Sequence, residues 1–184
     1  MSDFYQSGSI ATLHRLGRPN LELLEQELAE HARGCPIALV LPCLYSELEG
    51  PALGGIVAHL KKVPYLNEIV IALGRASALE FRRAKEYFKG LPQDVRLIWI
   101  DGPRVQETLN LLVGQEIDVG LPGKGQSCWI AFGYVLARRR SKVIVLHDCD
   151  IVTYDREYVV RLCYPIAKPN LSYEFCKGNY ARRS

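Results

Sequence analysis

Apolar residues occur along this chain in short continuous runs, separated by longer stretches with helical spacing. The runs at residues 37–41, 68–73, 95–100 and 142–146 are too short for helices and show no polar alternation. They therefore predict strands that are buried on both faces. Pro42 follows the first run directly, and because proline cannot donate to a strand ladder, we expect the first strand to stop there.

The segments between these runs have the spacing of amphipathic helices. Helices are predicted at about residues 20–34, 52–62, 77–88, 103–113 and 125–139. Asn20 can cap the first, and Ser77 with Glu80 three residues later forms a capping box for the third. The alternation of strands and helices predicts an α/β fold, a Rossmann-like and mostly parallel sheet sandwiched by helices.

Length and composition describe an ordinary globular chain. Its 184 residues, 48% hydrophobic and 23% charged, predict a single domain over residues 1–184. The net charge of +3 is too small and too scattered for a general nucleic-acid binder. The sequence has neither a membrane-length apolar run nor a secretory leader, so we expect a cytoplasmic protein without membrane contact. The six cysteines lack ligand spacing and are predicted to be free thiols.

Candidate chemistry is strongest in residues 142–150, KVIVLHDCD, where an apolar strand runs directly into two aspartates. Residues i and i+2 of an extended segment point to the same side, so Asp148 and Asp150 can face one point at the carboxyl edge of the sheet. Two carboxylates suit Mg²⁺ or Mn²⁺. The alternative is a solvated strand end whose acids cap the next helix, near Asp155.

A second candidate is LPGKGQS, residues 121–127, directly before a predicted helix. Its glycines let backbone amides approach an anion, and Lys124 adds a positive charge suited to phosphate. The segment is not a Walker A loop, because Gly125 stands where serine or threonine is required. The alternative is a mobile glycine-rich turn.

The third candidate is LPCLYSELEGP, residues 41–51. Its backbone can read a flat base edge, and Glu47 and Glu49 can accept hydrogen bonds from imide or hydroxyl groups. The alternative is an ordinary loop between a strand and a helix.

Two basic groups have different interpretations. We expect one group, at the end of a helix, to be solvated; it comprises Arg138, Arg139 and Arg140. Near the end of the chain, Lys177, Arg182 and Arg183 follow a predicted strand that contains tyrosine and phenylalanine. They are candidates for phosphate contact, although chain ends are often merely solvated.

Taken together, the order and spacing of LPCLYSELEG, PGKG, VIVLHDCD and KGNYARR resemble nucleotide-sugar glycosyltransferases of the GT-A type. The likeness is to the retaining glucosyl-3-phosphoglycerate synthases and their mannosyl relatives, and it covers about residues 37–183. It implies metal-dependent transfer of a hexose, with retention, from a nucleotide sugar to 3-phosphoglycerate. UDP-glucose is the favoured donor.

The resemblance also implies roles for particular residues. Lys124 would approach the diphosphate or the uridine, Asp148 the ribose, and Asp150 would bind Mg²⁺ or Mn²⁺. Lys177 and Arg182 would contact the acceptor's phosphate. The residues that would line the base are Leu41, Pro42, Cys43, Leu44 and Glu47. No catalytic residue is identified.

Only 34 residues follow Asp150, whereas enzymes of this kind use downstream segments for the acceptor and a downstream histidine for the metal. We therefore expect the donor-binding portion of a longer enzyme, with exposed apolar surface that favours self-association, such as a homodimer. Two alternatives remain open. Residues 148–152, DCDIV, fit the haloacid-dehalogenase phosphatase pattern, with Asp148 as nucleophile. The chain could also be a non-catalytic nucleotide-binding module.

Overall fold

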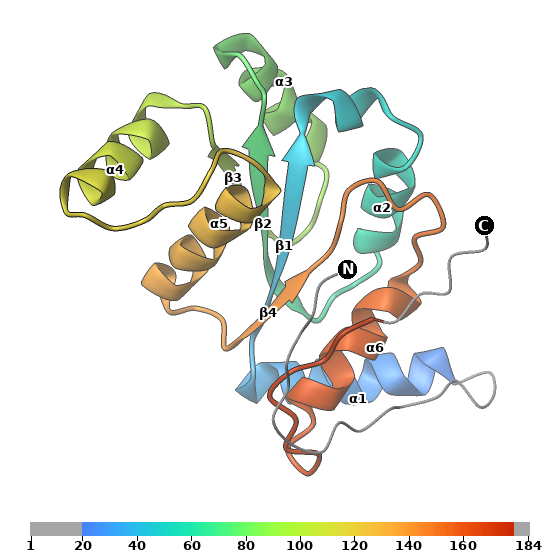
Figure 1. Ribbon diagram of the computed structural model, residues 1–184. Helices are drawn as coiled ribbons and strands as arrows, with labels where there is room; N and C mark the ends of the chain where they lie inside the picture. The colour runs from blue at the N-terminus through green and yellow to red at the C-terminus, as the bar shows by residue number, and fades with distance from the viewer. Residues whose placement is uncertain (1–19, 179–184) are drawn as a thin grey trace, which may run out of the picture.

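A four-stranded parallel sheet forms the centre of the protein, which is described over residues 20–178 by a computed structural model. The strands are β1 (Ile37–Leu44), β2 (Leu66–Gly74), β3 (Asp94–Trp99) and β4 (Val143–Leu146). They lie in the order β3-β2-β1-β4, and every neighbouring pair is parallel (Figure 1). The predicted parallel sheet is confirmed.

Helices cover both faces of the sheet. On one face lie α1 (Leu21–Gly34), α2 (Leu53–Leu60), α3 (Ala78–Phe88) and α6 (Arg156–Ala167), which share a core cluster with alternate strand residues such as Leu39. On the other face, α5 (Lys124–Arg138) packs on the intervening residues, including Val40. Helix α4 (Pro103–Gly114) projects beyond α5 (Figure 1). None of the helices in the described range is both long and apolar enough to cross a bilayer.

Local capping explains where two helices begin. The side chain of Asn20 accepts a hydrogen bond from the Leu23 amide at 3.1 Å. At the start of α3 the Ser77 amide donates to Glu80 Oε2 at 2.7 Å, and the Glu80 amide donates to Ser77 Oγ at 3.3 Å. Both predicted caps are confirmed, so these helix starts are specified by the sequence.

The prediction that the first strand stops at Pro42 is wrong, because β1 continues to Leu44. Backbone groups of successive residues in a parallel strand point to opposite neighbours, so those of residues i and i+2 point to the same neighbour. Val40 accepts from the His147 amide at 3.1 Å, so the ring nitrogen of Pro42 also points to the β4 side. Strand β4 has already ended at Leu146, and therefore the missing N–H of proline costs no ladder hydrogen bond.

The basic group at the end of α5 is more than a solvated helix terminus. Arg138 Nε lies 3.2 Å from Oε2 of Glu68, a β2 carboxylate that is completely buried. Arg138 and Arg140 both contact Asp94 Oδ2, at 3.0 and 2.8 Å. Ser141 Oγ donates to Glu68 Oε1 at 2.7 Å. A buried carboxylate needs such partners, so the prediction of simple solvation is wrong for Arg138.

The predicted strand near the end of the chain is also wrong within the described residues. Helix α6 occupies residues 156–167 and is capped by Asp155, whose side chain accepts from the Glu157 amide at 3.0 Å. After α6 the chain forms no strand up to residue 178, and Ser172 has a left-handed φ of 53° that interrupts any extended run. Cys176 Sγ instead contacts the α6 carbonyl of Arg161 at 3.9 Å.

Candidate functional site

The candidate site lies where β1 and β4 separate at their carboxyl ends. These two strands are neighbours in the sheet although helices and two other strands intervene in the sequence, so their junction is the topological switch point. Open α/β sheets bind ligands in the crevice outside such a point. Leu146, the last residue of β4, pairs with Val40, whereas β1 runs on to Leu44. The segments that follow both strands therefore border the crevice.

Two predicted motifs meet on the α5 side of this crevice. Lys124, the first residue of α5, places its Nζ 2.6 Å from Oδ1 of Asp148. Burial alternates after β4, with His147 and Cys149 buried, Asp148 half-buried and Asp150 exposed. The two aspartates are thus more accessible than their neighbours, but Cys149 and Asp150 form a turn, so the extended geometry predicted for the acidic pair is not kept. The structure brings PGKG and the acidic pair together.

The acidic pair changes the pKa of Lys124. Burial lowers the pKa of Lys124, but the hydrogen bond and charge of Asp148 outweigh it, and Asp150 adds to their effect, so the pKa is raised. The Lys124 and Asp148 side chains are nevertheless 58% and 45% exposed. An arriving diphosphate can therefore compete with Asp148 for the ammonium group, and Lys124 is a charged donor that a ligand can reach.

The acidic pair fits a hard divalent cation. Both side chains supply carboxylate oxygens, and Asp150 is exposed to solvent at the rim. Mg²⁺ and Mn²⁺ prefer such ligands and commonly complete their coordination with water and phosphate oxygens. The chemistry of the donor set therefore agrees with the predicted metal, with Asp150 the more accessible ligand.

The end of β1 offers fewer side chains to a ligand than predicted. Leu41 and Cys43 belong to the buried core, and Pro42 is buried as well. Leu44 is exposed, and Glu47, in the short 3-10 helix η1 (Tyr45–Glu49), is half-buried. Glu47 Oε2 accepts from the Leu44 amide at 3.1 Å. Of the five residues predicted to line the base, only Leu44 and Glu47 present side chains to solvent, so contacts from the others would have to come from the backbone.

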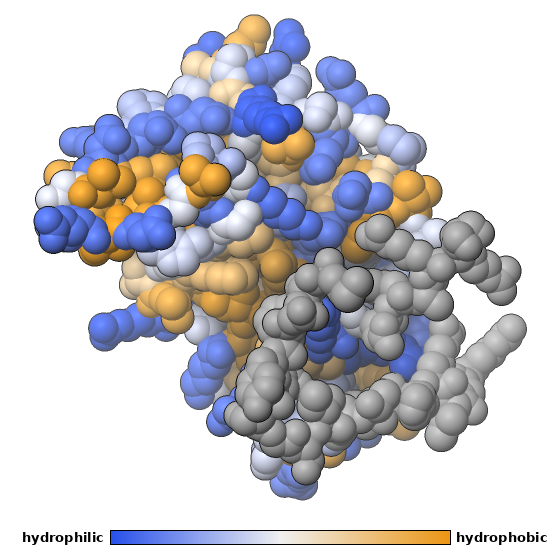
Figure 2. Space-filling view, viewed as in Figure 1, coloured by the Kyte–Doolittle hydropathy of each residue, from blue (hydrophilic) through white to orange (hydrophobic). Residues whose placement is uncertain are grey.

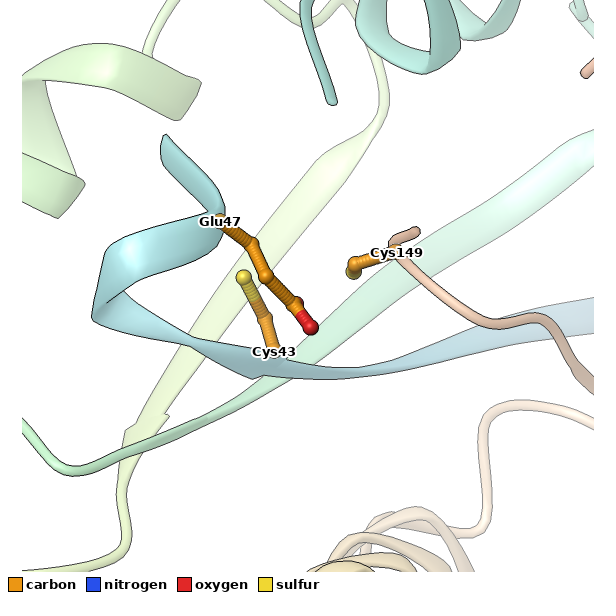
Figure 3. A group of neighbouring side chains, drawn as sticks. All are labelled: Cys43, Glu47 and Cys149. Carbon is orange, nitrogen blue, oxygen red and sulfur yellow. The ribbon is translucent and has the colours of Figure 1, made fainter. Parts of the chain in front are cut away.

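A cluster that the sequence did not reveal lies beside the acidic pair. Cys43, Glu47 and Cys149 each offer a ligand atom, and these atoms lie within 4.8 Å of one another (Figure 3). A hydrogen bond with Cys43, together with burial, raises the pKa of Cys149 well above its ordinary value. All six cysteines are free, as predicted. The spacing of cysteines along the chain gave no signal, because these two meet only where the ends of β1 and β4 lie side by side in the sheet.

The histidine next to the acidic pair belongs to the core. His147 is buried, and its Nδ1 lies 2.8 Å from the hydroxyl of Tyr154. Burial lowers the pKa of His147 to about 4, so the ring stays neutral at physiological pH. Its role in the described structure is packing beneath the acidic pair.

The predicted acceptor contacts remain predictions. Lys177 is exposed in the segment after α6, and Arg182 lies outside the described residues.

Comparison with known proteins gives two curated relatives, while no family model matches. A glucosyl-3-phosphoglycerate synthase of Persephonella marina is 44% identical over 182 residues, which are 99% of this chain and 45% of that protein. One from Methanococcoides burtonii is 36% identical over 185 residues, 98% of this chain and 44% of that protein. The chain thus spans less than half the length of these relatives. Neither relative carries the name of a phosphatase.

A solved structure shares the fold. It is the crystal structure of glucosyl-3-phosphoglycerate synthase from Mycobacterium tuberculosis in complex with Mn²⁺, UDP and glucosyl-3-phosphoglycerate. The match has a TM-score of 0.53 at 21% identity and covers 85% of this chain and 47% of that one. The resemblance predicted from the motifs is therefore confirmed: over nearly its whole length, this chain is similar to a little under half of a glucosyl-3-phosphoglycerate synthase.

Proposed function

We propose that this chain is the nucleotide-sugar-binding part of a glycosyltransferase that moves a hexose to 3-phosphoglycerate with retention, with UDP-glucose as the favoured donor. The observation that carries the proposal is the 2.6 Å contact between Lys124 and Asp148 at the switch point of the sheet. It joins a phosphate-binding type of loop to a metal-binding type of acidic pair at the place where such sheets bind ligands. The names of the two curated relatives support the same activity.

Each site residue has a role in this proposal. Asp150 would hold Mg²⁺ or Mn²⁺, Asp148 would accept from the ribose, and Lys124 would turn from Asp148 to the diphosphate. Glu47 and the backbone from Leu41 to Leu44 would contact the base. A bound divalent cation would stabilise the negative charge that develops on the β-phosphate as the nucleotide leaves. The chain's own contribution is to hold the diphosphate at the rim of the sheet.

Residues 1–184 would form one donor-binding domain, with Lys177 and Arg182 as the proposed contacts of the acceptor's phosphate. Hydrophobic side chains gather over α4 and the segment after it (Figure 2). Three of them, Leu111, Val113 and Leu121, are 64%, 56% and 88% exposed. Exposed apolar surface of this kind supports association with a second copy. Light scattering should therefore show mass above the monomer at high protein concentration, and a monomer at every concentration would refute this part.

A non-catalytic nucleotide-binding module is the second candidate. Glucose transfer from UDP-glucose to 3-phosphoglycerate distinguishes the two. Metal-dependent UDP binding without transfer would favour the module. Phosphate release from an aryl phosphate, abolished in Asp148→Asn, would instead revive the phosphatase alternative.

Calorimetric titration of the 184-residue chain with UDP-glucose, with and without Mn²⁺, tests the proposal. Binding should need the metal, and Asp150→Ala should weaken it by at least about tenfold, or about 1.4 kcal/mol. Glu107→Ala, which removes the same charge from an exposed position of α4, is the matched control and should leave the affinity unchanged. Equal affinities for the wild type and Asp150→Ala would end the proposal.

A further inference from the structure

The pairing of β1 with β4 brings two cysteines together beyond the last residue of β4. The ladder joins Ile37 to Val143 and Val40 to Leu146 in one unbroken register. Three residues beyond the last ladder pair lie Cys43, which is still in β1, and Cys149, which is in the turn that follows β4. Both thiols are buried, with 3% and 2% of their surface exposed. The central strand pair therefore brings the segments that carry these two thiols to the same end of the sheet.

The two cysteines lie on the opposite side of the chain from the acidic pair. Cys43 and Cys149 belong to the core cluster that includes α2, α3 and α6, whereas Asp148 contacts Lys124 at the start of α5. The burial pattern agrees with this separation, because Cys149 is buried whereas Asp148 is half-buried and Asp150 is exposed. A ligand of the thiols would thus occupy a different place from an ion held by Asp148 and Asp150.

Glu47 completes a set of three donors. Its carboxylate oxygen and the two sulfur atoms all lie within 4.8 Å of one another, and Figure 3 shows the side chains converging from η1, β1 and the segment after β4. Glu47 Oε2 already accepts from the Leu44 amide, but a carboxylate has a second oxygen that can bind a cation. Glu47 is half-buried, so it also offers a path to solvent.

We propose that Cys43, Glu47 and Cys149 bind a thiophilic divalent cation of the Zn²⁺ class, at a site separate from the proposed Mg²⁺ or Mn²⁺ site. Zinc takes sulfur and carboxylate ligands together, at about 2.3 and 2.0–2.2 Å, and three protein ligands leave a fourth position for water. Tetrahedral geometry then needs the two sulfur atoms about 3.8 Å apart. The two sulfur atoms lie at most 4.8 Å apart, so side-chain movements of about 1 Å bring them to that distance.

Binding would release the two thiol protons to solvent, and the two thiolates with the carboxylate would face the doubly charged ion. The ion would tie the end of β1 to the segment after β4, across the point where these strands separate. It should therefore stabilise the folded chain, since a preformed site binds the native state more tightly than the unfolded state.

Cobalt substitution in the wild-type chain gives the first test. The reduced, metal-free protein should bind one Co²⁺ with the near-ultraviolet charge-transfer absorption that marks cobalt–thiolate bonds, and one equivalent of Zn²⁺ should remove that absorption. A spectrum without thiolate absorption would overturn the proposal. Because this measurement needs no substitution, it remains decisive even where a variant fails to fold. No nucleotide is present, so its failure leaves the proposed donor binding untouched.

Competition with a chromophoric zinc chelator identifies the ligands. Cys43→Ser and Cys149→Ser should each weaken Zn²⁺ binding at least tenfold, and Glu47→Gln should weaken it as well. Cys163→Ser, which alters a buried thiol of α6 outside the cluster, is the matched control and should keep the wild-type affinity. Asp150→Ala should also keep it. Zinc affinity that falls in Asp150→Ala, or that is unchanged in both cluster serine variants, would overturn the proposal.

Discussion

The buried carboxylate of Glu68 makes Arg138 important for the stability of the folded chain. Glu68 is 0% exposed; Arg138 Nε lies 3.2 Å from its Oε2, and Ser141 Oγ donates to its Oε1 at 2.7 Å. Arg138→Met keeps the length of the aliphatic side chain but removes the cation. The substitution therefore leaves the buried carboxylate of Glu68 without its cation, while the Ser141 hydroxyl still donates to it.

The expected loss follows from the geometry of the pair. Two unit charges 3.2 Å apart interact by about 5 kcal/mol at an effective dielectric constant of about 20. Removing one partner of a buried pair costs about 3–5 kcal/mol. The Arg138 side chain is 20% exposed, so water can partly solvate Glu68 in the variant, and we expect the lower end, about 3 kcal/mol. At about 2–4 °C per kcal/mol for a chain of this size, the Tm should fall by about 6–12 °C.

Thermal and urea unfolding at neutral pH, followed by circular dichroism, measure this loss. The control is Arg140→Met, whose side chain is 50% exposed where it contacts Asp94, and which should cost less than about 1 kcal/mol. The double variant Glu68→Leu/Arg138→Met should recover most of the stability, because apolar side chains replace both charges. An Arg138→Met variant no less stable than Arg140→Met, or a double variant less stable than Arg138→Met, would refute the reasoning.

Three other perturbations test separate parts of the structure. Gly102→Ala would place a Cβ 2.6 Å from the Trp99 ring and should lower the free energy of unfolding in urea by about 1–3 kcal/mol. The control is Gly114→Ala, whose added Cβ would have no neighbour within 4 Å. Equal stabilities of the two variants would contradict this packing. The pKa of His147 is about 4 in the folded chain against an ordinary 6.5. Its contribution to the free energy of unfolding is therefore complete above pH 6.5 and is lost as the pH falls towards 4. Urea unfolding across this range should show a loss of about 3 kcal/mol that His147→Gln abolishes, and an unchanged profile in that variant would contradict the assignment. In calorimetry, Lys124→Met should weaken UDP binding at least about tenfold. The free energy of unfolding should change by less than about 1 kcal/mol, because the ion pair of Lys124 with Asp148 is exposed. Unchanged UDP binding would remove Lys124 from the proposed site.

Local composition was enough to predict the sheet and most of its helices. Continuous apolar runs identify strands covered on both faces, and capping residues such as Asn20 and Ser77 fix helix starts, so both signals lie within a few neighbouring residues. The sequence could not predict that β1 continues past Pro42, because the cost of the missing N–H depends on which neighbouring strand the proline nitrogen faces and on where β4 ends. That information belongs to the assembled sheet.

The candidate site was likewise predictable only in part from the sequence. The acidic pair and Lys124 were identified from their own motifs, and the fold then brought them together. Cys43 and Cys149 lie in different motifs, and they meet only because β1 and β4 are neighbours in the sheet. The partnership of Arg138 with Glu68 likewise joins α5 to β2. Long-range contacts of this kind leave no spacing pattern in the sequence.

A crystal of the chain grown with UDP and Mn²⁺, with data collected at the manganese absorption edge, tests the central claim most directly. The account predicts an anomalous peak within coordination distance of a carboxylate oxygen of Asp150, with the diphosphate bound to the same ion and close to Lys124. A peak away from the crevice between β1 and β4, or UDP bound there without contact to either acid, would contradict it.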